Sequence, residues 1–312
     1  MTWLRFIPET TNVDFVGWRY WAFGLDGLLL VASIVSILVY GFNFGIDFTG
    51  GVQMEVQYSK PIDIGKVRTS ISNLGFKDIE ITYFGGGQCD QPVNSCLLMR
   101  VKAKSDDADK GVERSVRQIL GPGYTFRDTQ IIGPKVSEEL FQSGVYATLL
   151  AVILISLYVA FRFEWQYGVG ALIATGHDVF VTAGFFSILH LDFTLNTVAA
   201  LLLLAGYSIN DTVVVFDRIR ENRRKYKRMP LTELINLSTN QIATRTTLVS
   251  AATSLSVVPM LFGGAVLLNF SAAILFGILV GTFSSTYVAA ALLLYLPAPA
   301  GTASVSTEDA VA

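Results

Sequence analysis

An aspartate, an asparagine and an arginine occur where the sequence is otherwise apolar, and their types favour proton chemistry. Asn210 and Asp211 lie within the stretch "LLLLAGYSINDTVVVF", and Arg245 follows thirty-four residues after the aspartate. A charge in lipid is costly and commonly marks an ion pathway or a buried pair. If Arg245 meets Asp211, a proton that neutralises the carboxylate releases the arginine, which gives two packings that differ by one proton. The alternative is a static salt bridge that only fixes helix register.

Other polar side chains in apolar runs could pass protons to this pair. His177 and Asp178 lie midway along another run, and histidine titrates near neutral pH. The alternative for them is an interhelical hydrogen bond that only supports packing. Hydroxyl groups could hold a file of water molecules toward Asp211, or they could be close-packing surfaces. The hydroxyl residues that could form this path are Thr246, Thr247, Ser250 and Ser285.

The elements that must position these residues are membrane helices. Of the 312 residues, 52% are hydrophobic and 15% are charged, and the mean hydropathy is +0.49. A hydrocarbon core of about 30 Å needs roughly 20 helical residues, and we predict six such spans. A net charge of −2, with the basic residues gathered locally, argues against a nucleic-acid partner. The predicted spans are Trp21–Phe42, Gly144–Phe161, Val169–Leu189, Leu195–Phe216, Thr246–Phe262 and Phe270–Leu296.

The charges of the loops predict the orientation. The segment 217–230 contains "RIRENRRKYKR" and is cytoplasmic by the positive-inside rule. Six spans then place both termini in the cytoplasm. The expected organisation is a cytoplasmic segment, a first helix, a domain outside the membrane, a five-helix bundle and a disordered cytoplasmic tail. Their residues are 1–20, 21–42, 43–142, 143–296 and 297–312.

The outer segment has the composition of a small soluble domain. "GGVQMEVQY" alternates as a half-buried strand does, and "IDIGKVRTSISNLGF" has helical spacing. Two more strands, a helix and a last strand follow. The order βαββαβ predicts a ferredoxin-like α+β domain inserted between the first two membrane helices. Cys89 and Cys96 flank the turn between its two middle strands, either as a disulfide or as two free thiols.

Motifs of common enzymes do not occur in the sequence. There is no G-x-x-x-x-G-K-[ST], H-E-x-x-H, C-x-x-C or G-x-S-x-G. We therefore expect no ATP site, no metal, no organic cofactor and no enzymatic activity, with protons as the coupling ion. A remaining alternative is an intramembrane aspartyl protease, in which Asp178 and Asp211 would face each other.

Several motifs resemble those of the SecF family of the bacterial Sec protein-export system, a branch of the resistance-nodulation-division superfamily. The resemblance covers nearly the whole chain, and the motifs that carry it are "FNFGIDFTGG", "GHDV", "GYSINDTVVVFDRIREN" and "TRT". Asp26, early in the first span, is more polar than the family resemblance leads us to expect. We expect it at the membrane interface.

The resemblance implies a function and partners. Asp211 carries over as the proton-binding carboxylate and Arg245 as its switching partner, with Asn210, His177 and Asp178 as further relay residues. The expected partners are SecD, the SecYEG translocon with YajC and YidC, preproteins and the lipid of the bacterial inner membrane. In the family the proton-motive force drives late, ATP-independent steps of translocation on the periplasmic side, and about 200 mV supplies about 4.6 kcal/mol per proton. The alternatives are a small-molecule exporter half of the same superfamily and a static structural subunit.

Overall fold

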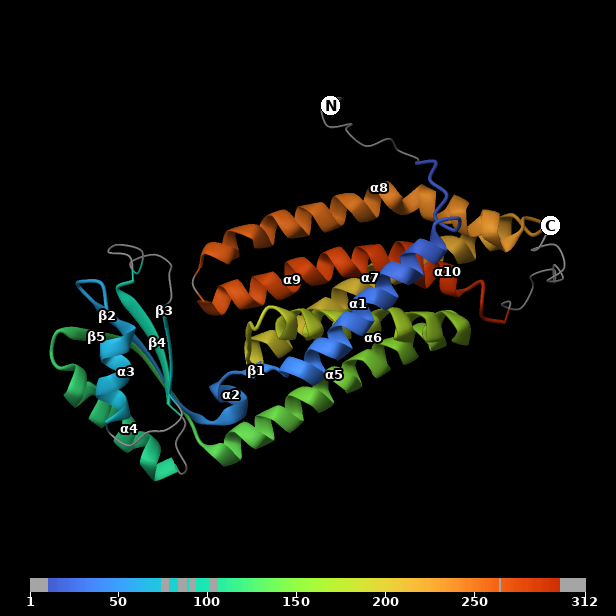
Figure 1. Ribbon diagram of the computed structural model, residues 1–312. Coiled ribbons are helices and arrows are strands. Elements are labelled where there is room, and N and C mark those ends of the chain that lie inside the picture. The colour runs from blue at the N-terminus through green and yellow to red at the C-terminus, as the bar shows by residue number, and fades with distance from the viewer. Residues whose placement is uncertain are drawn as a thin grey trace.

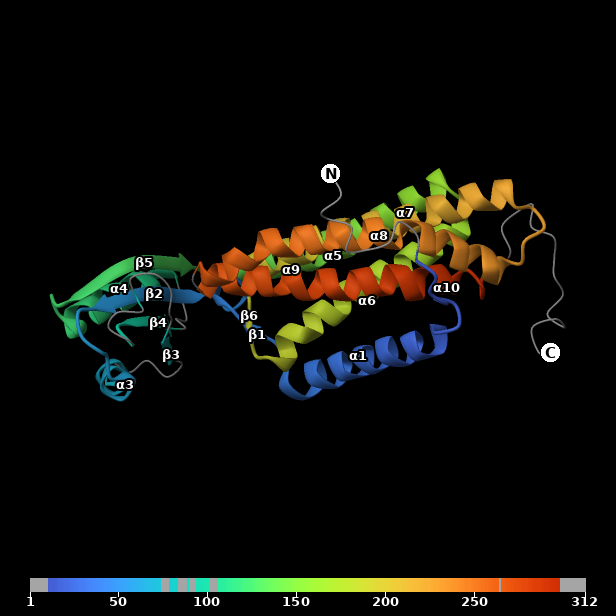
Figure 2. The same ribbon diagram turned by 90° about the horizontal axis from the view of Figure 1, so that it is seen from above.

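The computed structural model describes residues 11–73, 79–83, 89, 94–101, 106–263 and 265–297. In Figures 1 and 2 a small sheet domain lies beyond one end of a long bundle of helices. The predicted cytoplasmic tail lies outside the described residues except for Pro297, as do the first ten residues of the predicted N-terminal segment.

Six helices are long and apolar enough to cross a membrane, as the sequence predicts. In α6, α7 and the last helix, 56%, 50% and 44% of the apolar window is buried inside the chain, against 22%, 17% and 17% in α1, α5 and α8. α6, α7 and the last helix therefore form the centre of the bundle. The helices are α1 (Arg19–Tyr40), α5 (Pro134–Arg162), α6 (Trp165–Ile188), α7 (Leu195–Lys225), α8 (Leu231–Val257) with the 3₁₀ turn η2 (Val258–Phe262), and α9 (Ala265–Phe283) with the π-helical η3 (Ser284–Ala289) and α10 (Ala290–Leu292).

Three helices extend beyond the apolar runs that predict them. α5 begins at Pro134 rather than Gly144, α8 begins at Leu231 rather than Thr246, and α7 continues to Lys225. The reason is that hydropathy marks only the part of a helix that lies in lipid, whereas backbone hydrogen bonds continue into water. Proline at the first turn of α5 favours the earlier start, because its missing N–H would have no helical partner there.

Two glycines bring α9 close to α7. A Cβ on Gly277 would lie 2.5 Å from the Leu204 side chain, and one on Gly281 would lie 3.3 Å from Ser208 Cβ. Gly277 and Gly281 are four residues apart and form a small-xxx-small contact with α7. α7 is thereby held in the middle of the bundle, between α6 and α9.

The outer sheet is antiparallel, with the strand order β3-β4-β2-β5. It consists of β2 (Gly51–Tyr58), β3 (Ile79–Tyr83), β4 (Cys96–Val101) and β5 (Tyr124–Ile132). The helices α3 (Ile64–Ser72) and α4 (Asp106–Leu120) supply the rest of its core. Alternate residues of β2 face this core, as the period of two requires. The buried core residues include Val52, Met54, Val56, Val67, Ile71, Ile81, Leu97, Met99, Val112 and Val116.

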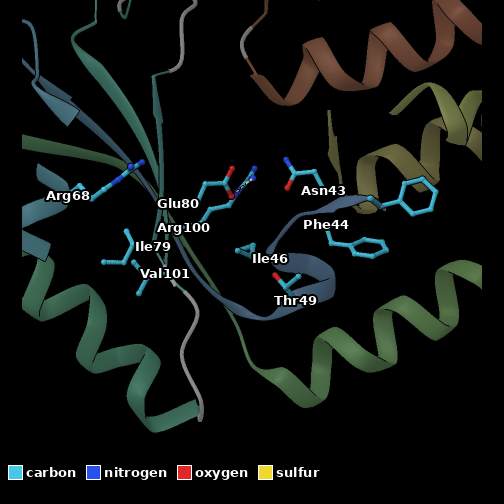
Figure 3. Close-up of a pocket in the computed structure, with 10 residues that line it drawn as sticks. Asn43, Phe44, Ile46, Thr49, Arg68, Ile79, Glu80, Arg100 and Val101 are labelled. Carbon is cyan, nitrogen blue, oxygen red and sulfur yellow. Dashed lines mark hydrogen bonds and ion pairs between the residues drawn. The ribbon is translucent and has the colours of Figure 1, made fainter. Parts of the chain in front are cut away.

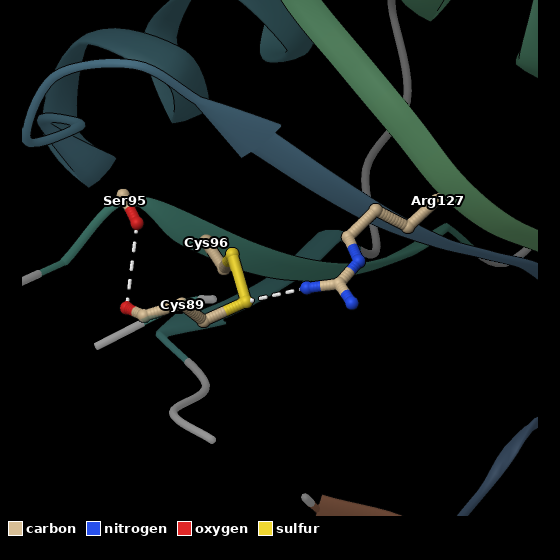
Figure 4. The surroundings of a disulfide bond; sticks show 4 residues. All are labelled: Cys89, Ser95, Cys96 and Arg127. Carbon is tan, nitrogen blue, oxygen red and sulfur yellow. Dashed lines mark hydrogen bonds between the residues drawn. A yellow bond between two sulfur atoms is a disulfide. The ribbon is translucent and has the colours of Figure 1, made fainter. Parts of the chain in front are cut away.

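A disulfide joins Cys89 to Cys96 at the start of β4, with the two Cα atoms 5.3 Å apart. Arg127 of β5 donates a hydrogen bond to Cys89 Sγ at 3.0 Å (Figure 4). Ser95 Oγ donates to the carbonyl oxygen of Cys89 at 3.3 Å. The bond closes the chain between the two middle strands, part of which lies outside the described residues.

The junction between the sheet domain and the bundle uses the residues that follow α1. The two-residue strand β1 (Asn43–Phe44) pairs in parallel with β6 (Asp192–Phe193), which precedes α7. After the short helix α2 (Ile46–Thr49), Gly50 has φ = 69°, and a Cβ there would lie 3.2 Å from Pro134 Cα. Glycine is required at this close approach because other residues rarely adopt that φ.

Candidate functional site

The outer end of α7 is fixed by two capping interactions. Thr194 and Thr197 form a capping box, and the backbone N–H of Leu195 donates to Asp47 Oδ2 of α2 at 2.8 Å. A carboxylate at a helix N-terminus satisfies an otherwise free N–H and is favoured by the helix dipole. The helix that carries Asp211 therefore begins on a residue of the segment that leads into the sheet domain.

Asp211 lies in the middle of α7 and is only 3% exposed. Its Oδ2 atom is buried and has no hydrogen-bond partner among the described residues. The Ser250 hydroxyl and the Arg245 guanidinium, both on α8, act on its carboxylate electrostatically. A carboxylate with one free oxygen in an apolar bundle is poorly solvated, so its charged form is costly. This environment favours a group that binds a proton.

Arg245 makes no ion pair with Asp211 within 4.0 Å in the part of the chain that the structure describes. The static salt bridge considered from the sequence is therefore not formed in this conformation. Arg245 is exposed, and so is Asn210, beside Asp211 on α7. Leu203, two turns earlier than Asn210 on the same side of α7, is 54% exposed. The polar residues of the predicted site thus lie at the edge of an open face of the bundle.

The four predicted hydroxyl residues differ in their burial and in their hydrogen bonds. Ser250 is hydrogen bonded to Thr282 of α9 at 2.7 Å and receives a bond from Tyr207 of α7 at 3.3 Å. Thr246 and Ser285 are buried, and Thr247 is exposed. Ser285 donates to the carbonyl of Thr282 at 3.2 Å. Ser250 is therefore the hydroxyl that links the Asp211 region to α9.

His177 and Asp178 are brought together, but against different helices from Asp211. Asp178 is fully buried and accepts hydrogen bonds from Ser208 Oγ of α7 at 2.5 Å and Ser284 Oγ of η3 at 2.8 Å. His177 Nδ1 lies 3.2 Å from Asp178 Oδ1. The aspartyl protease alternative requires two carboxylates that act together, and these two make their contacts with different groups. The arrangement gives no support to that alternative.

An ion pair between the two domains was not predicted from the sequence. Arg100 of β4 donates to Asp192 through Nη1 to Oδ1 at 2.9 Å and through Nη2 to Oδ2 at 2.5 Å. Asn43 Nδ2 donates to the same Oδ1 at 2.9 Å. Asn43 and Asp47 belong to the quoted motif "FNFGIDFTGG", and this motif could have marked them as functional residues. Nothing local links Arg100 to Asp192, because 92 residues separate them.

The surroundings of Arg100 strengthen this pair. Burial acts to lower the pKa of Arg100, but the hydrogen bond and charge of Asp192, with the charge of Glu80, outweigh burial and raise the pKa above its usual value. A cavity of about 540 Å³ opens beside the pair, between the sheet and the segment after α1 (Figure 3). The residues that line it are Phe42, Asn43, Phe44, Ile46, Thr49, Arg68, Ile79, Glu80, Arg100 and Val101.

Comparison with known proteins identifies the family. Residues 35–62 match the family described as "SecD/SecF GG Motif". "Protein export membrane protein SecD/SecF, C-terminal" matches residues 112–298, more than half of the chain. The chain belongs to the SecD/SecF family. The first match contains the junction with Gly50 and Gly51, and the second contains Asp211, Arg245 and the His177–Asp178 pair.

Within the SecD/SecF family the chain is similar to SecF subunits over nearly its full length. It is 39% identical over 305 residues to protein translocase subunit SecF of Rhodobacter capsulatus, which covers 94% of this chain and 91% of the relative. It is 40% identical over 289 residues to SecF of Escherichia coli O157:H7, covering 91% and 87%. These relatives support a role for the chain in protein translocation at a membrane.

A solved SecD/SecF structure has the same fold. The chain superposes on SecDF, a translocon-associated membrane protein from Thermus thermophilus, with a TM-score of 0.81 and 36% identity. The match covers 95% of this chain and 39% of the longer SecDF chain. The SecDF polypeptide therefore contains a region equivalent to this chain together with a further, larger region.

Proposed function

We propose that this chain is the SecF-like subunit of a SecD/SecF complex that uses the proton-motive force to drive late, ATP-independent steps of preprotein translocation. Protonation of Asp211 is the coupling event. The observation that carries the proposal is the Asp211 carboxylate itself, which is 3% exposed and has one oxygen without a hydrogen-bond partner. When the carboxylate gains or loses a proton, its charge changes, and so do the groups that can pack against it.

Arg245 is the proposed switching partner, and Asn210 lies beside the site. In the conformation described, Arg245 acts on Asp211 through its charge but makes no ion pair with it within 4.0 Å among the described residues. This arrangement fits the released arm of a switch, with Asp211 protonated. Deprotonation would attract the guanidinium, whose long stem allows it to move several ångströms.

The route from Asp211 to the outer domain runs along α7. About 24 Å of helix, at 1.5 Å per residue, separates Asp211 from Leu195, where Asp47 caps the helix. Three residues before Leu195, Asp192 binds Arg100 of the outer sheet. A shift of α7 along its axis therefore pulls directly on the sheet domain, and we infer that this motion acts on the translocating chain.

The open face beside Asp211 is the proposed contact with SecD. It combines the exposed polar residues Asn210 and Arg245 with the strongly exposed apolar residues Leu203, Leu248 and Leu255. The longer SecDF chain of Thermus thermophilus, in which this chain matches 39%, supports a larger partner region at such a face. We include SecYEG, YajC, YidC and the preprotein as further partners in the proposal.

The proposed setting is the bacterial inner membrane, with both termini in the cytoplasm. Basic residues at the end of α7, Arg223, Arg224 and Lys225, support the cytoplasmic side for that loop. The sheet domain then lies in the periplasm, where a disulfide persists. Its strand order supports the ferredoxin-like assignment, because the first and third strands of the βαββαβ unit are central in that fold.

Two alternatives are less well supported. A small-molecule exporter half needs a substrate pocket in a large outer domain, and this outer domain has about 100 residues. A static structural subunit would hold Asp211 in a formed ion pair, which the described conformation lacks. The function is proposed as transport coupling rather than enzymatic catalysis, with protons as the only cofactor.

The test is export at a fixed ATP supply in membranes that contain Asp211→Asn. We expect the part of export that depends on the proton-motive force to be lost, because asparagine cannot titrate, while ATP-driven export remains. Asp211→Glu keeps a titratable group and is expected to retain part of the activity. Asp217→Asn, at the exposed aspartate one and a half turns further along α7, is the matched control. Unchanged proton-dependent export in Asp211→Asn would contradict the proposal.

A further inference from the structure

A buried carboxylate on α1 has no place in the function proposed above. Asp26 is 5% exposed, and within the part of the chain that the structure describes both of its carboxylate oxygens are buried without a hydrogen-bond partner. The sequence predicts an interfacial position for Asp26, and this stays a prediction, but the structure shows that its side chain is buried within the chain. Asp26 lies 14 residues before the outer end of α1, which is about 21 Å, and seven residues after the inner end, about 10 Å.

α1 and α6 pack so closely that Asp26 faces α6 rather than lipid. A Cβ on Gly184 would lie 2.2 Å from Ser33, and Ser36 is hydrogen bonded to Ser187 at 2.9 Å. Two helical turns before Gly184 on α6 is His177, and two turns before Ser33 on α1 is Asp26. The same face that joins the helices through small residues thus brings Asp26 and His177 to one level.

The contacts of His177 define its protonation state. Nδ1 lies 3.2 Å from a carboxylate oxygen of Asp178, and Nε2 lies 3.5 Å from the backbone carbonyl oxygen of Asp26. Both neighbours are acceptors, and an imidazole offers hydrogen bonds to two acceptors only when both nitrogens carry a proton. These two contacts favour the imidazolium form of His177.

The charges around the imidazolium complete the cluster. Asp178 accepts hydrogen bonds from the hydroxyls of Ser208 and Ser284 and lies beside His177 Nδ1. These donors stabilise its ionised form. Asp26 has no donor, and its charged form would be unsolvated between two helices. The charged groups that act on Asp26 are His177 and Asp178, and the polar group contributed near them by η3 is the Ser284 hydroxyl.

We propose that Asp26, His177 and Asp178 form a second proton-binding site, separate from Asp211, on the α1 side of the bundle. In the proposed form both nitrogens of His177 are protonated, Asp178 is ionised and Asp26 is protonated, which leaves the three side chains with no net charge. Release of the Asp26 proton leaves a carboxylate beside the imidazolium and a net charge of −1. No bond other than O–H changes in this step.

The second site is connected to the first through α7. Ser208, which donates to Asp178, lies one turn before Asp211 on the same helix. The gap between the two levels is about 4.5 Å along the helix axis. Protons from the α1 side could therefore reach Asp211 by way of Asp178, and this use of the site rests on the proposed function.

Infrared spectroscopy of the full chain in phospholipid vesicles tests the site without any export assay. We expect Asp26→Asn to remove the carbonyl stretch of one protonated carboxyl group at pH 7. Asp128→Asn, at an exposed aspartate of β5, is expected to leave this band unchanged. A spectrum in which Asp26→Asn removes no protonated carboxyl band would overturn the proposal.

Histidine NMR supplies a second readout that does not depend on the Asp26 variant. The chain has two histidines, and His190→Asn leaves His177 as its only imidazole. Asparagine suits this position because residue 190 has φ = 51°. We expect both nitrogens of His177 to be protonated at pH 7, and one of them to lose its proton when Asp178 is changed to Asn. A neutral His177 in the parent would refute the site, whereas the Asp211 proposal would stand.

Discussion

The ion pair between Arg100 and Asp192 provides a quantitative test of how the outer domain is attached. Two hydrogen bonds of 2.9 and 2.5 Å join the guanidinium to the carboxylate. The side chains are 10% and 21% exposed. Exposed pairs contribute about 0.2–1 kcal/mol, and breaking a buried pair costs about 3–5 kcal/mol. Because this bidentate pair lies between those limits, we expect a coupling energy of about 2 kcal/mol.

A double-mutant cycle isolates this energy from the other contacts of each residue. The variants are Arg100→Gln, Asp192→Asn and the pair combined. Single variants also disturb Glu80, which lies 3.4 Å from Arg100, and Asn43, which binds Asp192. The cycle subtracts those effects when each of them is unchanged by the second substitution.

The assay is energy transfer between fluorophores on exposed positions of α3 and α8, with the chain in phospholipid vesicles. It reports the fraction of molecules in which the sheet domain is docked on the bundle. An energy of about 2 kcal/mol changes the ratio of docked to undocked molecules by about 30-fold. We expect that factor in the interaction term between the two substitutions.

The matched control is the pair Arg117–Glu113 within α4, which is 47% and 29% exposed and does not link the domains. Arg117→Gln should leave docking unchanged. If the coupling energy between Arg100 and Asp192 is as small as the effect of Arg117→Gln on docking, the ion pair does not hold the outer domain. The proposed route from α7 to the sheet is then wrong.

Three further outcomes test the outer domain and the bundle. Burial raises the pKa of Glu55, so this carboxyl destabilises the domain once it ionises. Glu55→Gln should therefore raise the resistance of the domain to urea at pH 8. This gain in stability should vanish below about pH 4, where the carboxyl of Glu55 is protonated in the unfolded chain as well. Reduction or serine replacement of Cys89 and Cys96 should lower the hydrogen-exchange protection of β4 by up to about 2.5 kcal/mol, the chain-entropy value for so short a loop. Gly281→Val should cost about 1–3 kcal/mol in thermal unfolding because a Cβ meets Ser208 at 3.3 Å, whereas Gly24→Val, with nothing within 4 Å, should be near neutral.

The sequence predicted the parts of the fold that depend on local patterns. Six apolar runs gave six membrane helices, and the alternation of Val52, Met54 and Val56 gave a strand with these residues in the core. Helix ends such as Pro134 were missed because hydropathy does not mark where a helix ends in water.

The candidate site depends more on distant contacts, and there the sequence was less informative. Asp211 and Asp178 stand out as carboxylates in apolar runs, and that signal needs no structure. Which groups solvate each of them depends on helix rotation, which spacing along one chain does not define. The burial of Asp26 was missed for this reason, since only the packing of α1 on α6 shows that its side chain is buried and that its backbone carbonyl lies near His177.

The central claim is that protonation of Asp211 moves the outer domain, and energy transfer under an imposed pH gradient tests it directly. The chain is reconstituted with its SecD partner in vesicles, with the same fluorophores on α3 and α8. We predict that the gradient changes the transfer efficiency in the wild type and in Asp211→Glu, and that Asp211→Asn abolishes the change. An equal response in Asp211→Asn and the wild type would contradict the account.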